Sequence, residues 1–128
     1  MIVVDASAVV AMIAKEPVHE SLTARLAANA DRFISPVSYV EVVMALTRSM
    51  PDGKLTADDY MSATSISVLP IDADQAQWAV HAHTFYGKGR HAARLNLGDC
   101  FSYAAAKALN APLLYVGDDF GKTDIRAA

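Results

Sequence analysis

The sequence predicts an α/β fold, a three-layer α/β/α sandwich around a central, mainly parallel sheet. Short apolar runs rich in branched residues alternate along the chain with longer segments of helical periodicity. The 128 residues fit one compact domain that spans 1–128. Hydrophobic residues make up 53% of the chain, and Ala and Val account for much of the excess. This composition suits a sheet that helices cover on both faces.

Four buried strands are predicted, each from a short apolar run. They cover residues 2–4, 32–34, 66–71 and 113–116. Helical segments separate these strands, so the connections are expected to be right-handed crossovers between parallel strands.

Six helices are predicted from apolar periodicity and from capping signals. They cover residues 6–14, 18–30, 36–50, 56–65, 73–85 and 98–109. Pro36 stands at a first helical position, and Asn110 is expected to end the last helix. Thr56 and Asp72 each begin a pattern that resembles a capping box, so we expect them to cap the helices that follow.

Charge and cysteine content narrow the functional classes. The net charge is −3, so the chain as a whole is not a basic nucleic-acid binder. Cys100 is the single cysteine, which excludes an internal disulfide and favours a reducing, cytoplasmic setting. The apolar N-terminus lacks a basic region and is interrupted by Asp5, so it does not resemble a signal peptide. No segment is long enough to span a bilayer, and no membrane association is expected.

Acidic residues are predicted to converge on one edge of the sheet. Asp5 directly follows the first strand, and Asp118 and Asp119 directly follow the last. The carboxyl ends of parallel strands share an edge, where sites form in open α/β sheets. Asp99 begins the helix that leads into the last strand, and Glu41 lies in the second turn of the helix after the second strand. Both helices therefore begin near that same edge.

Each of these residues has an ordinary structural interpretation. An aspartate in a first helical turn is most often a cap, the Asp118–Asp119 pair could form a turn, and Glu41 could pair with Arg48. Together, however, the carboxylates would repel one another. A hard divalent cation such as Mg²⁺ or Mn²⁺ removes that repulsion and prefers oxygen ligands. Such an ion could orient a phosphodiester and activate water against it.

Four segments resemble one family. MIVVDASAVVAMI, SPVSYVEVVMAL, LNLGDCFSYAAAKAL and LLYVGDDFGKTDI resemble the PIN domain of VapC-type toxins from bacterial type II toxin–antitoxin systems. The resemblance covers the whole chain, with the segments in the family order. It implies a Mg²⁺- or Mn²⁺-dependent endoribonuclease that cleaves RNA of the translation machinery, tRNA or rRNA. It also implies a cognate VapB-type antitoxin that neutralises the enzyme, a homodimer and a toxin–antitoxin hetero-oligomer.

The resemblance also implies roles for particular residues. Asp5, Glu41 and Asp99 match the first three catalytic and metal-binding acids of the family. The fourth lies in GDDF, where the family pattern G-x-D-F favours Asp119 and an alignment on the strand end favours Asp118. By the same resemblance, Asp124 is a weaker candidate that would act behind the metal ligands. Ser7 is a candidate to hold the backbone or a metal-bound water.

A basic loop precedes Asp99 and is a candidate RNA contact. It carries Lys88, Arg90, His91 and Arg94, and its alternative is a solvated loop without a partner. Two other functions remain open. One is a catalytically silent PIN fold that acts as a binding module. The other is a phosphoacceptor receiver domain, although its acidic pair would follow the first strand rather than the last.

Overall fold

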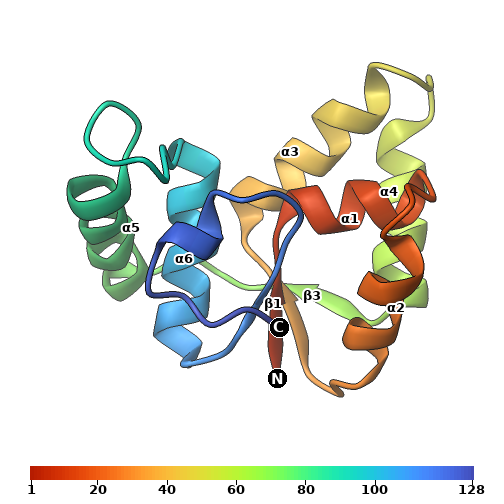
Figure 1. Ribbon diagram of the computed structural model, residues 1–128. Coiled ribbons are helices and arrows are strands. Elements are labelled where there is room, and N and C mark those ends of the chain that lie inside the picture. The colour runs from red at the N-terminus through yellow and green to blue at the C-terminus, as the bar shows by residue number, and fades with distance from the viewer.

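The central sheet has four parallel strands. The computed structural model describes all 128 residues and orders the strands β3-β2-β1-β4 (Figure 1). The strands are β1 (Ile2–Val4), β2 (Arg32–Ile34), β3 (Ile66–Val68) and β4 (Leu113–Leu114). β1 pairs with β2 and β4, and β2 pairs with β3, all in parallel. The predicted α/β class and the parallel sheet are confirmed.

Six α-helices and one short 3₁₀ helix connect and cover the strands. They are α1 (Ala6–Ile13), α2 (His19–Ala27), α3 (Pro36–Thr47), α4 (Gly53–Ala63), α5 (Ala73–Tyr86), α6 (Leu97–Leu109) and η1 (Phe120–Lys122). None of the helices combines the length and the apolar character that crossing a bilayer requires.

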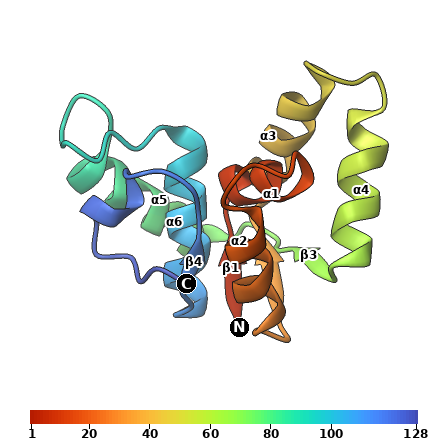
Figure 2. The same cartoon turned by 45° about the vertical axis from the view of Figure 1, so that its right-hand side comes forward.

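Two hydrophobic cores lie on opposite faces of the sheet. Side chains alternate along a strand, so Ile2 and Val4 face one core while Val3 faces the other. The first core is closed by residues of α1, α2, α3 and α4, and the second by residues of α5 and α6. Figures 1 and 2 show α5 and α6 on one side of the sheet, with α1, α2 and α4 on the other. The predicted three-layer arrangement is therefore present.

Several predicted boundaries differ from the structure: the helices predicted over 18–30 and 36–50 end at Ala27 and Thr47, and three further differences have an identifiable cause. The strand predicted over 66–71 ends at Val68, because Pro70 has no N–H to donate to a ladder. The last strand ends at Leu114, and the Val116 N–H donates to Ser7 Oγ rather than to another strand. The helix predicted to begin at Thr56 begins at Gly53, so Thr56 is not its cap. Gly53 packs against the Thr47 backbone so closely that a β-carbon would overlap it.

Most of the predicted caps are confirmed. The Asp72 side chain accepts a hydrogen bond from the Gln75 N–H at 2.9 Å, as a helix N-cap does. The Gln75 side chain donates to the Pro70 carbonyl, so the predicted reciprocal box is only half formed. Asn110 adopts a left-handed conformation with φ 48° and ends α6.

Candidate metal centre

Asp5 is buried at the carboxyl end of β1, where it caps α1. The residue is only 4% exposed. Oδ2 accepts hydrogen bonds from the Ser7 N–H at 3.0 Å and from the Ser7 hydroxyl at 2.6 Å. Ser7 Oγ in turn accepts from the Val116 N–H at 3.0 Å. The predicted role of Ser7 as a holder of the backbone is therefore present, and it ties the end of β1 to the segment after β4.

Two further serines hold the other oxygen of Asp5. Ser102 Oγ donates to Asp5 Oδ1 at 2.5 Å, and the Ser38 and Ser102 hydroxyls lie 2.8 Å apart. Since the Ser102 proton goes to the carboxylate, Ser38 is the donor to Ser102. Both serines are fully buried. The resulting network fixes the orientation of Asp5 from α1, α3 and α6 at once.

The sequence analysis did not single out Ser38 or Ser102. A serine inside a helix has no distinctive local pattern, because its partner comes from elsewhere in the fold. A weak signal was present in the spacing. Ser38 precedes Glu41 by three residues, and Ser102 follows Asp99 by three, so each shares a helix face with an acidic candidate.

Glu41 is partly buried on α3 and lies against the first turn of α6. Its carboxylate occupies the space where a side chain of Gly98 would be, so any β-carbon at position 98 would overlap it. No ion pair joins Glu41 to Arg48, so the predicted alternative partner is wrong. Burial raises the pKa of Glu41, and the charges of Asp5 and Asp99 raise it further.

Asp99 both caps α6 and belongs to the acidic cluster. Its Oδ2 accepts from the Asn96 N–H at 3.1 Å, and Asn96 Oδ1 accepts from the Asp99 N–H at 2.9 Å. This reciprocal pair is a capping box. No hydrogen bond engages Oδ1 of Asp99, so one oxygen is available to a ligand. The cap and the ligand interpretations are therefore compatible.

The pKa of Asp99 is raised from 3.8 to about 6. Burial is the largest cause, the hydrogen bond from Asn96 opposes it, and the charges of Asp5 and Asp119 raise it further. Acidic groups that disfavour one another's ionisation are typical of sites that receive a cation.

Asp118 and Asp119 follow β4 and are both exposed. They lie after Gly117, whose φ of +106° turns the chain out of the strand. The charge of Asp119 acts on the pKa of Asp99, whereas that of Asp118 is not among the causes. The electrostatics therefore favour Asp119 as the fourth acid of the cluster.

The carboxylate oxygens of these four acids are suitable ligands for a hard divalent cation, although the side chains are not yet arranged around a common point. The charges of Asp5 and Asp119 help to raise the pKa of Asp99, and those of Asp5 and Asp99 help to raise the pKa of Glu41. Neither ion pair of the protein involves any of the four acids. No three histidine, cysteine or acidic side chains stand in a geometry that could hold an ion. Binding would therefore include movement of these side chains toward one another.

Asp124 is held by two side chains of α6, and its role behind the metal ligands stays a prediction. It forms an ion pair with Lys107 Nζ at 2.7 Å and accepts from the Tyr103 hydroxyl at 2.8 Å. Burial acts to raise the pKa of Asp124, but the bonds from Lys107 and Tyr103 outweigh it and lower the pKa. These contacts fasten the C-terminal segment to α6.

Cys100 is not a nucleophile in this environment. The thiol is buried beside Asp99, and burial, with a smaller contribution from the Asp99 charge, raises its pKa to about 11. A reactive thiol needs the opposite shift.

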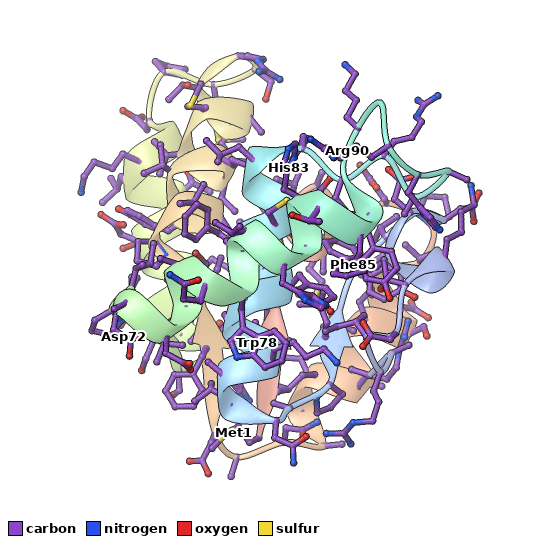
Figure 3. All side chains as sticks on the ribbon, turned by 90° about the vertical axis from the view of Figure 1, so that its left-hand side faces the viewer. Met1, Asp72, Trp78, His83, Phe85 and Arg90 are labelled. Carbon is purple, nitrogen blue, oxygen red and sulfur yellow. The ribbon has the colours of Figure 1, made fainter.

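The basic loop over 87–95 adjoins the start of α6. Backbone hydrogen bonds from Lys88 to Leu95 and from Leu95 to Tyr86 close its base. Lys88, Arg90 and Arg94 are exposed, and no ion pair involves any of them. Figure 3 shows Arg90 extending away from the body of the protein. These cations are free to contact a polyanion near Asp99.

Comparison with known proteins agrees with this geometry. The protein-family model for the PIN domain matches residues 2–126. VapC ribonuclease Mb0640 of Mycobacterium bovis is 42% identical over 124 residues, which cover 96% of this chain and 95% of that protein.

Solved structures with low sequence identity share the fold. VapC20 of Mycobacterium tuberculosis, described as a sarcin–ricin loop cleaving toxin, superposes with a TM-score of 0.76 at 19% identity. The match covers 100% of this chain and 98% of the VapC20 chain. VapBC2 of Rickettsia felis, bound to a DNA fragment from its promoter, superposes with a TM-score of 0.77 at 19% identity, again over 100% and 98% of the two chains.

Proposed function

This chain belongs to the PIN-domain family, among the VapC ribonucleases of toxin–antitoxin systems, and we propose that its endoribonuclease activity depends on Mg²⁺ or Mn²⁺ held by the acidic cluster. Asp5, Glu41, Asp99 and Asp119 are the proposed ligands. The observation that carries the proposal is the raised pKa of Glu41 and of Asp99 beside other acids of the cluster, with no positive side chain paired to any of the four. A divalent cation supplies the missing charge.

The chain's own residues prepare this site. Ser7 and Ser102 hold Asp5 in one orientation, and Asn96 holds one oxygen of Asp99 while the other stays available. The N-terminus of α6 carries partial positive charge from its backbone N–H groups, which favours a phosphate at this position. When bound, the cation would supply Lewis-acid polarisation of the phosphodiester and of the attacking water. Asp99 loses its proton near pH 6, so the cluster is ready for a cation at neutral pH.

The proposed substrate is structured RNA of the translation machinery, tRNA or rRNA. VapC20, whose fold this chain shares, is described as cleaving the sarcin–ricin loop, and the transfer of an RNA substrate of this kind to this chain is part of our proposal. Lys88, Arg90 and Arg94 are the proposed contacts to the RNA backbone. They supply local positive charge in a chain whose total charge is −3.

A VapB-type antitoxin is the proposed inhibitor, and a homodimer within a toxin–antitoxin hetero-oligomer is the proposed assembly. The VapBC2 structure is such a toxin–antitoxin protein in another organism. Large apolar side chains exposed on α3 and at the start of α6 support partner surfaces, with Val40 at 52%, Met44 at 55% and Leu97 at 71% exposure.

The activity can be tested with purified, antitoxin-free protein and total bacterial RNA. We expect defined fragments with Mg²⁺, none with EDTA, and none from Asp99→Asn. Asp59→Asn is a matched control, because Asp59 is exposed on α4 and makes no side-chain hydrogen bond or ion pair. Sequencing the fragment ends would name the RNA and the bond.

The alternative of a catalytically silent PIN-fold binding module would be supported by a folded protein that neither binds metal nor cleaves RNA. Family membership removes the receiver-domain alternative. RNA cleavage that is unaffected by EDTA and by Asp99→Asn would indicate a contaminating nuclease.

A further inference from the structure

A hollow of about 420 Å³ opens directly beside the acidic cluster, between α1 and α3. Ser7 and Glu41, which belong to the acidic site, are among its lining residues. Val10, Met44 and Ala45 contribute to its apolar wall. Glu16 and Arg48 line it as well, and neither has a role in the function proposed above.

The length of the hollow along α3 follows from the spacing of its lining residues on that helix. Glu41, Ala45 and Arg48 recur at intervals of four and three residues, so they share one face of the helix. At 1.5 Å per residue, Arg48 lies about 10 Å along the helix axis from Glu41. This is close to the reach of a single nucleotide from its phosphate to the edge of its base. The hollow is also at the small end of the usual range for small-ligand sites.

Glu16 and Arg48 have no partners in the protein. Both are exposed, and no side-chain hydrogen bond or ion pair involves either of them. The carboxylate of Glu16 can accept hydrogen bonds, whereas the guanidinium of Arg48 can only donate. A ligand that satisfies both must present donors and acceptors side by side.

We propose that this hollow is a subsite for one guanosine next to the bond that is cut, with Glu16 and Arg48 reading the base. Guanine offers adjacent N–H donors at N1 and N2 to a carboxylate, and its O6 and N7 accept bidentate hydrogen bonds from arginine. The apolar wall of Val10, Met44 and Ala45 contacts the flat face of the base. This inference rests on the proposed ribonuclease function, because Ser7 and Glu41 belong both to the hollow and to the site of cleavage.

Continuity with the acidic cluster favours RNA over a protein as the occupant. Ser7 and Glu41 line the hollow and also belong to the acidic cluster at which the scissile phosphate would lie, so the nucleoside next to that phosphate can enter it. The second hollow of the protein, about 510 Å³, lies between α5 and the start of α6 and is lined mostly by apolar residues.

Methyl-resolved NMR of the ¹³C-labelled protein in Mg²⁺ buffer tests the subsite directly. We would titrate GMP, AMP, CMP and UMP separately and follow the methyl signals of Val10, Met44 and Ala45. GMP should shift these signals with at least about fivefold tighter binding than UMP, since one well-formed base contact discriminates by that much or more. Glu16→Gln and Arg48→Gln should each weaken GMP binding about tenfold, as expected for loss of a charge-assisted contact.

Two further variants complete the experiment. Ala45→Phe should fill the hollow and abolish the GMP-induced shifts. Arg126→Gln is the control for loss of one positive charge, because Arg126 contacts the Asn110 carbonyl far along the chain from the hollow and should bind GMP as the wild type does. Glu16 and Arg48 are exposed, so their variants test the idea even if Ala45→Phe fails to fold.

The outcomes separate the two proposals. Nucleotide shifts that are absent, that are equal for all four bases, or that persist in Glu16→Gln and Arg48→Gln would overturn the guanosine subsite. If RNA is still cleaved in that case, the proposed ribonuclease function stands. Shifts produced by an antitoxin peptide and by none of the nucleotides would overturn the subsite in favour of a protein contact. Specific GMP binding by a protein that cleaves no RNA would retain the nucleotide site and remove the nuclease.

Discussion

Replacing Asp99 with asparagine is expected to stabilise the metal-free protein at neutral pH. The carboxyl is ionised above pH 3.8 when the chain is unfolded, but burial and the neighbouring charges keep it protonated up to about pH 6 in the fold. At this residue the native state therefore binds more protons in this window, and the contribution of Asp99 to stability falls as the pH rises from about 4 to about 6. The introduced asparagine does not titrate, and its amide oxygen can still accept from the Asn96 N–H.

The size of the effect follows from the raised pKa. The difference between 3.8 and about 6 corresponds to about 3 kcal/mol at 1.36 kcal/mol per unit. Asp99 is partly exposed, so solvent screening reduces the expected gain to about 1–2 kcal/mol. For a chain of 128 residues this is a rise in Tm of about 4–7 °C.

Calorimetric scans in EDTA between pH 4.5 and pH 8 measure this gain. It should grow up to about pH 6 and remain constant above it. Mg²⁺ should then raise the Tm of the wild type more than that of Asp99→Asn, because the variant lacks one proposed ligand. A gain that does not depend on pH, or an Asp99→Asn protein less stable than the wild type at pH 7.5, would refute the electrostatic reasoning.

Three further predictions concern the contacts around the acidic cluster. Gly98→Ala should change the unfolding free energy by less than about 1 kcal/mol, because the flexible Glu41 side chain can rotate away, yet it should reduce RNA cleavage as strongly as Glu41→Ala does. The double variant should cleave RNA as well as Glu41→Ala alone, and an additive loss of cleavage would contradict a shared cause. Ser102→Ala should cost about 1–3 kcal/mol in urea denaturation, since it leaves Asp5 Oδ1 and the buried Ser38 hydroxyl without a partner, whereas the exposed Ser62→Ala should stay within about 0.5 kcal/mol. Tyr103→Phe should cost about 0.5–1.5 kcal/mol and speed proteolysis of the C-terminal segment, since it removes the hydrogen bond to Asp124. Unchanged proteolysis would contradict a role of this bond in holding the segment.

Local patterns in the sequence predicted the elements whose signals are local. The strands over 2–4 and 32–34 match the structure, and the caps at Asp72 and Asn110 are confirmed. Some predicted boundaries were wrong because a tertiary contact determines where the helix or strand begins or ends. Gly53 begins α4 three residues early because it packs on α3, and the Ser7–Val116 hydrogen bond accompanies the early end of β4. The early end of β3 has a local cause instead, because Pro70 stands in the sequence and cannot donate to a ladder.

The residues of the candidate site likewise fall into those that the sequence predicted and those that only the tertiary structure identifies. Strand order and crossover rules place Asp5, Asp99 and Asp119 at one edge, which is a deduction from topology. The support for these acids comes from Ser38, Ser102 and Gly98, whose partners lie on other elements, so the local sequence carries at most the weak signal of the three-residue spacing. A motif suggested Asp124, but the sequence did not indicate the ion pair with Lys107 that the structure adds.

The central claim is that the acidic cluster at the carboxyl ends of β1 and β4 binds a divalent cation. The most direct measurement is the site-resolved paramagnetic broadening of backbone amide signals by substoichiometric Mn²⁺. We predict that the amides of Ser7, Gly98 and Asp99 broaden first and that Asp5→Asn abolishes the effect. Broadening that begins elsewhere, for example at Asp58 and Asp59 of α4, or that survives Asp5→Asn, would contradict the account.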